Sequence, residues 1–192
     1  MGNCEYRILC GFLYIMAFGL SFYTVLPLYL YGPIFKFPKS HIPKVQVDSV
    51  TVDSFNIHSS KLTVNWDINL SVGNPNWNHE FRYKDARVSV FYQKKMIASS
   101  PVTSPFISGP IRARVSASSV HVDEWISRAL ADEWKRGGVY FTFRLDAAAL
   151  KDYVFSSSQM TVSCEEVKVR AISGANLGNM AGSSTKCQVN ML

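Results

Sequence analysis

Hydrophobic residues are distributed in two different ways along the chain, and the first is a long stretch without charge. Residues 8–35 contain no Asp, Glu, Lys, Arg or His. The hydrocarbon core of a bilayer is about 30 Å thick, and a helix needs roughly 20 apolar residues to cross it. The stretch predicts a transmembrane signal-anchor helix over residues 8–31, preceded by a short N-terminal tail over residues 1–7. A buried core helix fits less well, because such helices rarely lack a polar face over this length.

A cleaved signal peptide is the alternative interpretation of the same stretch. It needs a short apolar region followed by small residues at a cleavage site. Here the apolar region is longer, and the sequence Tyr-Gly-Pro-Ile-Phe at its end lacks that pattern. We therefore expect the helix to be retained, so that the chain is anchored with most of its residues on one side of a membrane.

The second pattern follows a polar, Pro-containing juxtamembrane linker over residues 32–44. From there on, apolar positions recur at every second residue. The clearest case is residues 62–72, where six apolar side chains alternate with Thr, Asn, Asp and Ser, and the alternation returns in residues 86–92, 111–115 and 139–145. Such alternation is typical of antiparallel strands that have one buried and one solvated face.

These strands predict a mainly β domain over residues 45–192. With about seven strands and turn signals between them, the most economical architecture is an antiparallel two-sheet sandwich. The apolar parity shifts between Val47 and Val50 and again between Cys164 and Val167. Each shift predicts a β-bulge or a bend, because a change of one residue moves the side chains to the other face.

One short helix is predicted inside the β domain. Asp123 is a suitable N-cap, Ile126, Leu130 and Trp134 follow at four-residue spacing, and Gly137-Gly138 ends the pattern. The apolar stripe is narrow and acidic residues flank it. We expect the helix to cover an open end of the sandwich, and a membrane-surface or partner-binding face is the alternative.

The net positive charge of the chain indicates which kinds of partner it could bind. The net charge is +6 and the pI is about 9.2, which favours anionic lipid headgroups or an acidic polysaccharide as a partner. The basic residues are scattered and form no aromatic-interleaved stripe or known binding module, so nucleic acid is not an expected partner.

The four cysteines fall into two pairs by position. Cys4 and Cys10 lie at the membrane edge, where cysteines are candidates for palmitoylation. Cys164 and Cys187 lie late in the β domain and are a candidate disulfide if the domain is translocated. Free thiols are the alternative for both pairs.

One N-glycosylation sequon is present, Asn69-Leu70-Ser71. The alternation places Asn69 on the wet face of its strand, so a glycan is sterically possible there. Use of the sequon requires the domain to be lumenal or extracellular, and sequons inside strands are often unused.

No residue pattern points to catalysis, a cofactor or a metal. The four histidines, His41, His58, His79 and His121, are isolated from one another and from metal-ligand spacings. No G-x-S-x-G sequence frames a serine nucleophile. The Gly-rich run over residues 173–184 lacks the G-K-[ST] of a phosphate loop and is interpreted as a flexible hairpin loop. We therefore expect a protein that is not an enzyme.

The stretch VNWDINLSVGNPNWNHEFRYKDARVSVFYQKKMIASSPV (residues 64–102) carries a resemblance to a known family. It resembles the plant harpin-induced-like (NHL) proteins, which have a late-embryogenesis-abundant group-two domain and are catalogued as hydroxyproline-rich glycoproteins. The matching features are a strand leading into the turn motif Asn74-Pro75-Asn76, an aromatic strand after it, and a final strand containing Lys186-Cys187-Gln188-Val189. The order of a short N-terminus, one membrane helix and one such domain also matches.

The resemblance implies a fibronectin-III-like sandwich at the plant plasma membrane, with the N-terminus in the cytosol and the domain facing the cell wall. It also implies a link to defence or stress responses, and some relatives are placed at plasmodesmata. This chain lacks the Pro-rich cytosolic segment of many relatives. A simple Lys/Arg count disagrees with the implied orientation, because Lys36, Lys39 and Lys44 follow the helix while only Arg7 and the α-amino group precede it. The candidate disulfide and the sequon favour the outward orientation.

Two functions from different classes follow. The first is a non-enzymatic, membrane-anchored domain that binds an unknown protein partner or the cell wall in defence or stress signalling. The alternative is a lipid-binding or membrane-contact module, in which the sandwich holds lipid in an apolar groove between its sheets, including a role at plasmodesmata. An enzyme with a site assembled from distant residues is the weakest hypothesis.

Overall fold

The computed structural model describes residues 16, 19, 23, 42–73, 81–103, 106, 107, 109–151, 154–172 and 175–191. The chain divides into two compact units, Met1–Phe37 and Pro38–Leu192. In the first unit Met16, Gly19 and Tyr23 are helical. The rest of the predicted anchor over residues 8–31, and the palmitoylation candidates Cys4 and Cys10, lie outside the described residues. Within the described residues, no helix combines the length and the apolar character needed to cross a membrane.

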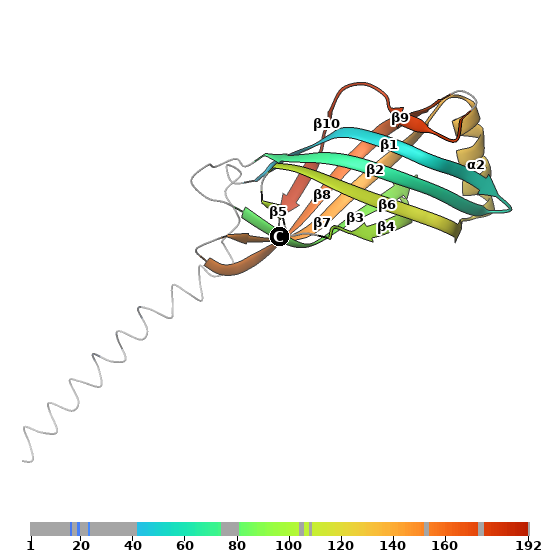
Figure 1. The fold of residues 1–192 in the computed structure, drawn as a ribbon. Helices are drawn as coiled ribbons and strands as arrows, with labels where there is room; N and C mark the ends of the chain where they lie inside the picture. The colour runs from blue at the N-terminus through green and yellow to red at the C-terminus, as the bar shows by residue number, and fades with distance from the viewer. Residues whose placement is uncertain are drawn as a thin grey trace, which may run out of the picture. The chain divides into compact units, whose positions relative to one another are not determined.

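Eleven strands and one helix form the described part of the second unit (Figure 1). The strands are β1 (Lys44–His58), β2 (Lys61–Gly73), β3 (Phe81–Tyr92), β4 (Lys95–Pro101), β5 (Phe106–Ile107), β6 (Gly109–His121), β7 (Val139–Lys151), β8 (Val154–Ala171), β9 (Gly178–Met180), β10 (Thr185–Lys186) and β11 (Gln188–Met191). The helix is α2 (Glu124–Lys135).

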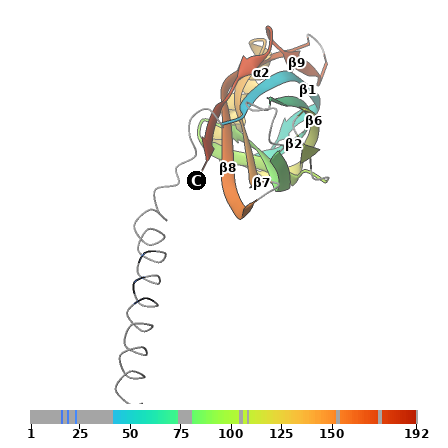
Figure 2. The same cartoon turned by 90° about the vertical axis from the view of Figure 1, so that its left-hand side faces the viewer.

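All strands belong to one antiparallel sheet in the order β4-β3-β7-β8-β9-β1-β2-β6, with β5, β10 and β11 paired to β3, β1 and β8. The sheet curls until it is nearly barrel-shaped, and Figure 2 shows the strands around a common interior. The predicted mainly antiparallel β domain with one helix is therefore confirmed. The strands are joined by hydrogen bonds into a single sheet, whereas the sequence predicted two.

Alternating side chains explain both the strands and the core. In β2 every second residue from Leu62 to Val72 is buried, and the other three alternating segments lie in β3, β6 and β7 as predicted. The inward side chains of facing strands meet in the interior. Trp66 of β2 packs edge-on against Phe141 of β7 with ring centroids 5.7 Å apart, although these strands are not neighbours in the sheet. The two halves of the curled sheet thus bury one another.

Both predicted irregularities are present. The pairing of β1 with β2 shifts between Val47 and Ser49. The pairing of β7 with β8 shifts where Glu165 and Glu166 stand opposite Thr142, and Glu166 has a φ of 55°. Each bulge adds one residue to the strand. The apolar residues before and after it therefore all point to the buried face.

Helix α2 covers one end of the curled sheet, as its apolar stripe predicts. Ile126 and Leu130 are fully buried, and Trp134 stacks on Phe55 of β1 with ring centroids 4.0 Å apart. Asp123 precedes the helix as expected, but its carboxylate forms an ion pair with Lys95 of β4 and makes no capping hydrogen bond. The helix is thus fixed to three parts of the sheet end by burial, stacking and charge.

The C-terminal segment, residues 178–191, lies between β8 and β1. β9 pairs with both β1 and β8, β10 pairs with β1, and β11 pairs with β8. Because each pairing is antiparallel, β1 and β8 run in the same direction on either side of this segment. The flexible-loop interpretation of residues 173–184 is wrong for β9, because this strand joins β8 to β1 through backbone hydrogen bonds.

Gly178 is expected to be essential for this closure. A Cβ atom at Gly178 would lie 2.6 Å from Trp134 Cη2 and 3.0 Å from the Arg170 carbonyl oxygen. Gly178→Ala should therefore lower the free energy of unfolding by about 1–3 kcal/mol, measured by thermal unfolding of the detergent-solubilised full chain. Gly73→Ala is the matched control, because the new Cβ would lie 3.4 Å from the Lys44 carbonyl oxygen, an ordinary contact. Equal effects of the two substitutions would contradict the proposed role of Gly178.

Candidate functional site

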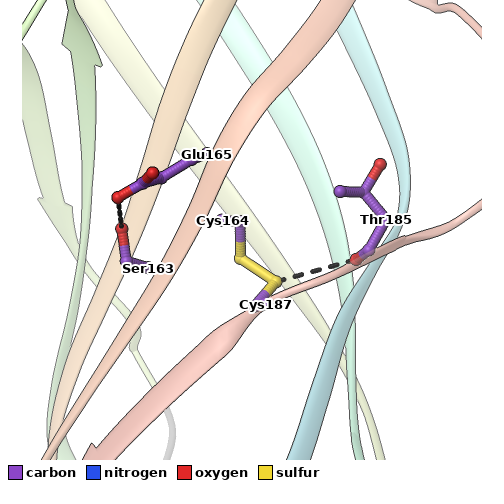
Figure 3. Close-up of a disulfide and its surroundings, with 5 residues drawn as sticks. All are labelled: Ser163, Cys164, Glu165, Thr185 and Cys187. Atoms are coloured by element: carbon purple, nitrogen blue, oxygen red, sulfur yellow. Dashed lines mark hydrogen bonds between the residues drawn. A yellow bond between two sulfur atoms is a disulfide. The ribbon is translucent and has the colours of Figure 1, made fainter.

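The disulfide between Cys164 and Cys187 is the covalent element of the domain (Figure 3). The S–S distance is 2.07 Å and the Cα atoms are 4.3 Å apart. Cys164 points inward from β8 and is buried, because it continues the alternation of Met160 and Val162. The backbone N–H of Cys187 donates to the Val45 carbonyl oxygen at 2.9 Å. This one residue therefore ties the C-terminal segment to β8 by a covalent bond and to β1 by a hydrogen bond.

Asn69 of the sequon lies on the outer face of β2, inside a polar network that also includes side chains of β1 and β6. Its Nδ2 donates to Ser49 Oγ at 2.8 Å, and its Oδ1 accepts from Arg112 Nε at 3.2 Å. The Ser71 hydroxyl donates to Asp48. The oxygen and the nitrogen of the Asn69 amide thus each bind a neighbouring side chain in the folded sheet. Use of the sequon stays a prediction.

Charge in the same network is paired. Arg114 donates from Nε and an Nη atom to the two carboxylate oxygens of Asp67, at 2.8 and 2.9 Å. The hydrogen bond from Arg114 lowers the pKa of the Asp67 carboxyl, because it stabilises the ionised form. The outer face of β1, β2 and β6 therefore satisfies much of its own polarity.

The outer face of β3, β7 and β8 is different and carries a groove of about 500 Å³. Its lining includes the aromatic rings of Phe91 and Tyr140 and the charged side chains of Lys94, Arg144 and Glu165. Tyr140 is 52% exposed, and Lys168 Nζ lies 5.3 Å from the centre of its ring. We call this feature the outer groove. An exposed aromatic ring beside positively and negatively charged side chains is suited to binding a ligand rather than to packing in the core.

A second concave surface lies where β1 begins and β11 ends. It has a volume of about 840 Å³, and its charged lining residues are Lys44 and Lys186. We call it the entry concavity, because the described chain of the second unit enters here at Ile42. Among the described residues that line it, none is acidic.

Chemical groups with perturbed acidity lie in the core. Burial raises the pKa of Tyr83 to about 12. Burial and a hydrogen bond from its hydroxyl to Glu133, 2.9 Å long, raise the pKa of Tyr92. In the described residues, no group of three or more His, Cys, Asp or Glu could hold a metal ion.

The structure brings some predicted residues together and leaves others untested. It joins Cys164 to Cys187 and places Asn69 on the outer face. The turn motif Asn74-Pro75-Asn76 lies outside the described residues. Sequence analysis missed the outer groove and the entry concavity, because their residues come from separate strands. One residue could have indicated the groove from the sequence. Tyr140 places a large aromatic ring at an outward position of the alternating segment 139–145.

Comparison with protein-family models and with curated proteins finds no match to this chain.

Loss of the disulfide is expected to destabilise the domain. The bond spans 23 positions of sequence, and replacing both cysteines (Cys164→Ala with Cys187→Ala) should cost about 3 kcal/mol, because the unfolded chain gains freedom. Denaturant unfolding of the full chain measures the cost, and hydrogen exchange should show faster opening over residues 185–191. Cys4→Ala with Cys10→Ala is the matched control and should leave both unchanged. Alkylation of Cys164 and Cys187 without prior reduction would contradict the bond.

Proposed function

We propose that this chain is a non-enzymatic, single-pass membrane-anchored protein of plant defence or stress response. Its domain has the arrangement of a fibronectin-III-like sandwich, is displayed outside the cytosol at the plasma membrane, and binds a protein partner or the cell wall. The observation that carries the proposal is the Cys164–Cys187 disulfide, which closes the C-terminal segment onto β8.

The disulfide supports display outside the cytosol for a chemical reason. Structural disulfides persist in oxidising compartments and are rare in the cytosol, where thiols are kept reduced. Cys164 is 1% exposed, so the bond is part of the packed domain and not a surface thiol pair. Together with the predicted anchor over residues 8–31, this favours an N-terminus in the cytosol and the opposite side of the plasma membrane for the domain.

The outer groove is the surface we propose for partner or wall binding. Tyr140 offers an exposed ring, whose flat face packs well on an apolar ligand surface. Arg144 and Glu165 supply donor and acceptor groups within the same depression. Arg144 also binds Asp146 on its own strand, with 3.2 Å between Nε and Oδ1, so the two faces do not differ in charge pairing alone. The polar face around Asn69 is the weaker candidate, because the exposed ring of Tyr140 lies on the other face.

The second candidate function is membrane contact, including a role at plasmodesmata. A lipid held between the two halves of the sheet is not favoured, because Phe141 packs against both Trp66 and Tyr92 in the interior. Contact through the surface is favoured by the entry concavity, whose described lining carries Lys44 and Lys186 as its charged residues.

The orientation is tested on intact protoplasts. A tag fused after Leu192 should be removed by added protease, whereas a tag fused before Met1 should be protected, and the protein should stay in the membrane fraction after alkaline carbonate extraction. Protection of the C-terminal tag, or release of the protein by carbonate, would contradict anchored display outside the cytosol.

Binding through the outer groove is tested by proximity labelling in plant tissue with the full chain. Tyr140→Ala combined with Arg144→Ser should remove at least the most strongly labelled partner, because the ring and the charged donor are both lost from one depression. Met96→Ala is the control, because Met96 is 56% exposed on β4 and does not line the groove. An unchanged set of labelled proteins in the groove variant would rule out this surface.

A further inference from the structure

The start of β1 and the end of β2, which line the entry concavity, lie at the opposite end of the domain from α2 (Figure 1). Its lining comes from the start of β1, the end of β2 and the last strands of the chain. Lys44 and Lys186 stand on neighbouring strands here, because Gln46 of β1 pairs with Lys186 of β10. Two cationic side chains are therefore held on one concave surface by the sheet itself.

Both lysines are available to a ligand. Lys44 and Lys186 are exposed, and neither has an ion-pair partner in the part of the chain that the structure describes. Asp48 follows nearby on β1, but its two carboxylate oxygens accept hydrogen bonds from Gln46 and Ser71. Both donors line the concavity, so the Asp48 carboxylate lies beside it and offsets one of the two lysine charges. With two lysines against one carboxylate, the described residues of this surface keep a net positive charge.

Chain length limits how far this surface can lie from the predicted membrane segment. Only seven positions separate Phe35, the last residue of the uncharged stretch, from Ile42. Even a fully extended chain of that length spans at most about 25 Å. The same short stretch contains Lys36 and Lys39, so two further lysines precede Lys44 closely in the sequence.

We propose that the entry concavity is a seat for an anionic phospholipid headgroup of the membrane that holds the anchor. Lys44 and Lys186 would face the phosphate as point charges, and the amide of Asn190 lies in the same lining as a hydrogen-bond donor. A lysine near an anionic membrane surface contributes attraction that is screened by salt. The seat would hold the domain against its own bilayer, with the outer groove on the side of the sheet left free for a partner.

The proposal rests on the predicted anchor of the proposed function, but not on which side of the membrane the domain occupies. The full chain is reconstituted into nanodiscs of phosphatidylcholine alone, or of phosphatidylcholine mixed with phosphatidylserine. Acetylation of each lysine by acetic anhydride is then followed by mass spectrometry. We expect Lys44 and Lys186 to react about fivefold more slowly in the anionic nanodiscs, and the difference to disappear in high salt.

Lys61 and Lys135 are internal controls, because both are exposed and lie at the α2 end of the domain. Their reactivity should be the same in both nanodiscs. Equal reactivity of Lys44 and Lys186 in neutral and anionic nanodiscs would overturn the proposal. Equal slowing at all four lysines would also overturn it, because it would show general attraction rather than a seat. Neither result bears on orientation, which the protoplast experiment decides separately.

Discussion

Closure of the sheet by the C-terminal segment is the constraint on which the rest of the domain depends. β8 and β1 run in the same direction and are joined through β9, while β10 and β11 extend the seam along β1 and β8. Without this segment both long strands would present unpaired backbone groups along an exposed edge. The disulfide at Cys187 fixes the segment at one end, and the packing of Gly178 against Trp134 fixes it at the other.

Two regions of the outer face of the sheet have similar alternating sequences but form different surfaces. On β1, β2 and β6 the outward residues bind one another across strands, as Arg114 does with Asp67 and Arg112 does with Asn69. On β7 and β8 Asp146 likewise binds Arg144 and Thr161, but the bulge at Glu166 and the turn at Gln93 and Lys94 border a depression beside them. A face that satisfies its own charge stabilises the sheet, whereas a face with exposed rings and mixed charge is suited to recognition.

The sequence predicts those parts of the fold and of the candidate site that depend on residues close together in the chain. The six-fold alternation in β2 and the parity shift at Glu165 and Glu166 are local signals, so the strands and bulges were predicted correctly. β9, β10 and β11 contain two to four residues each and are strands only because distant partners receive their backbone groups. The outer groove was missed for a related reason: Phe91 and Thr142 become neighbours through the pairing register of β3 with β7, which the sequence does not display.

The position of the closing segment has a consequence for biosynthesis. Residues 178–191 are synthesised after every other strand of the described sheet, yet they lie between β1, the first of these strands, and β8. The growing chain therefore has to keep the edges of both strands from pairing wrongly until residues 178–191 have been added. Contacts between the first and the last strand also make folding slow, because a loop of nearly the whole domain has to close. Closure of the sheet and formation of the Cys164–Cys187 bond therefore have to follow the synthesis of all the other strands of the domain.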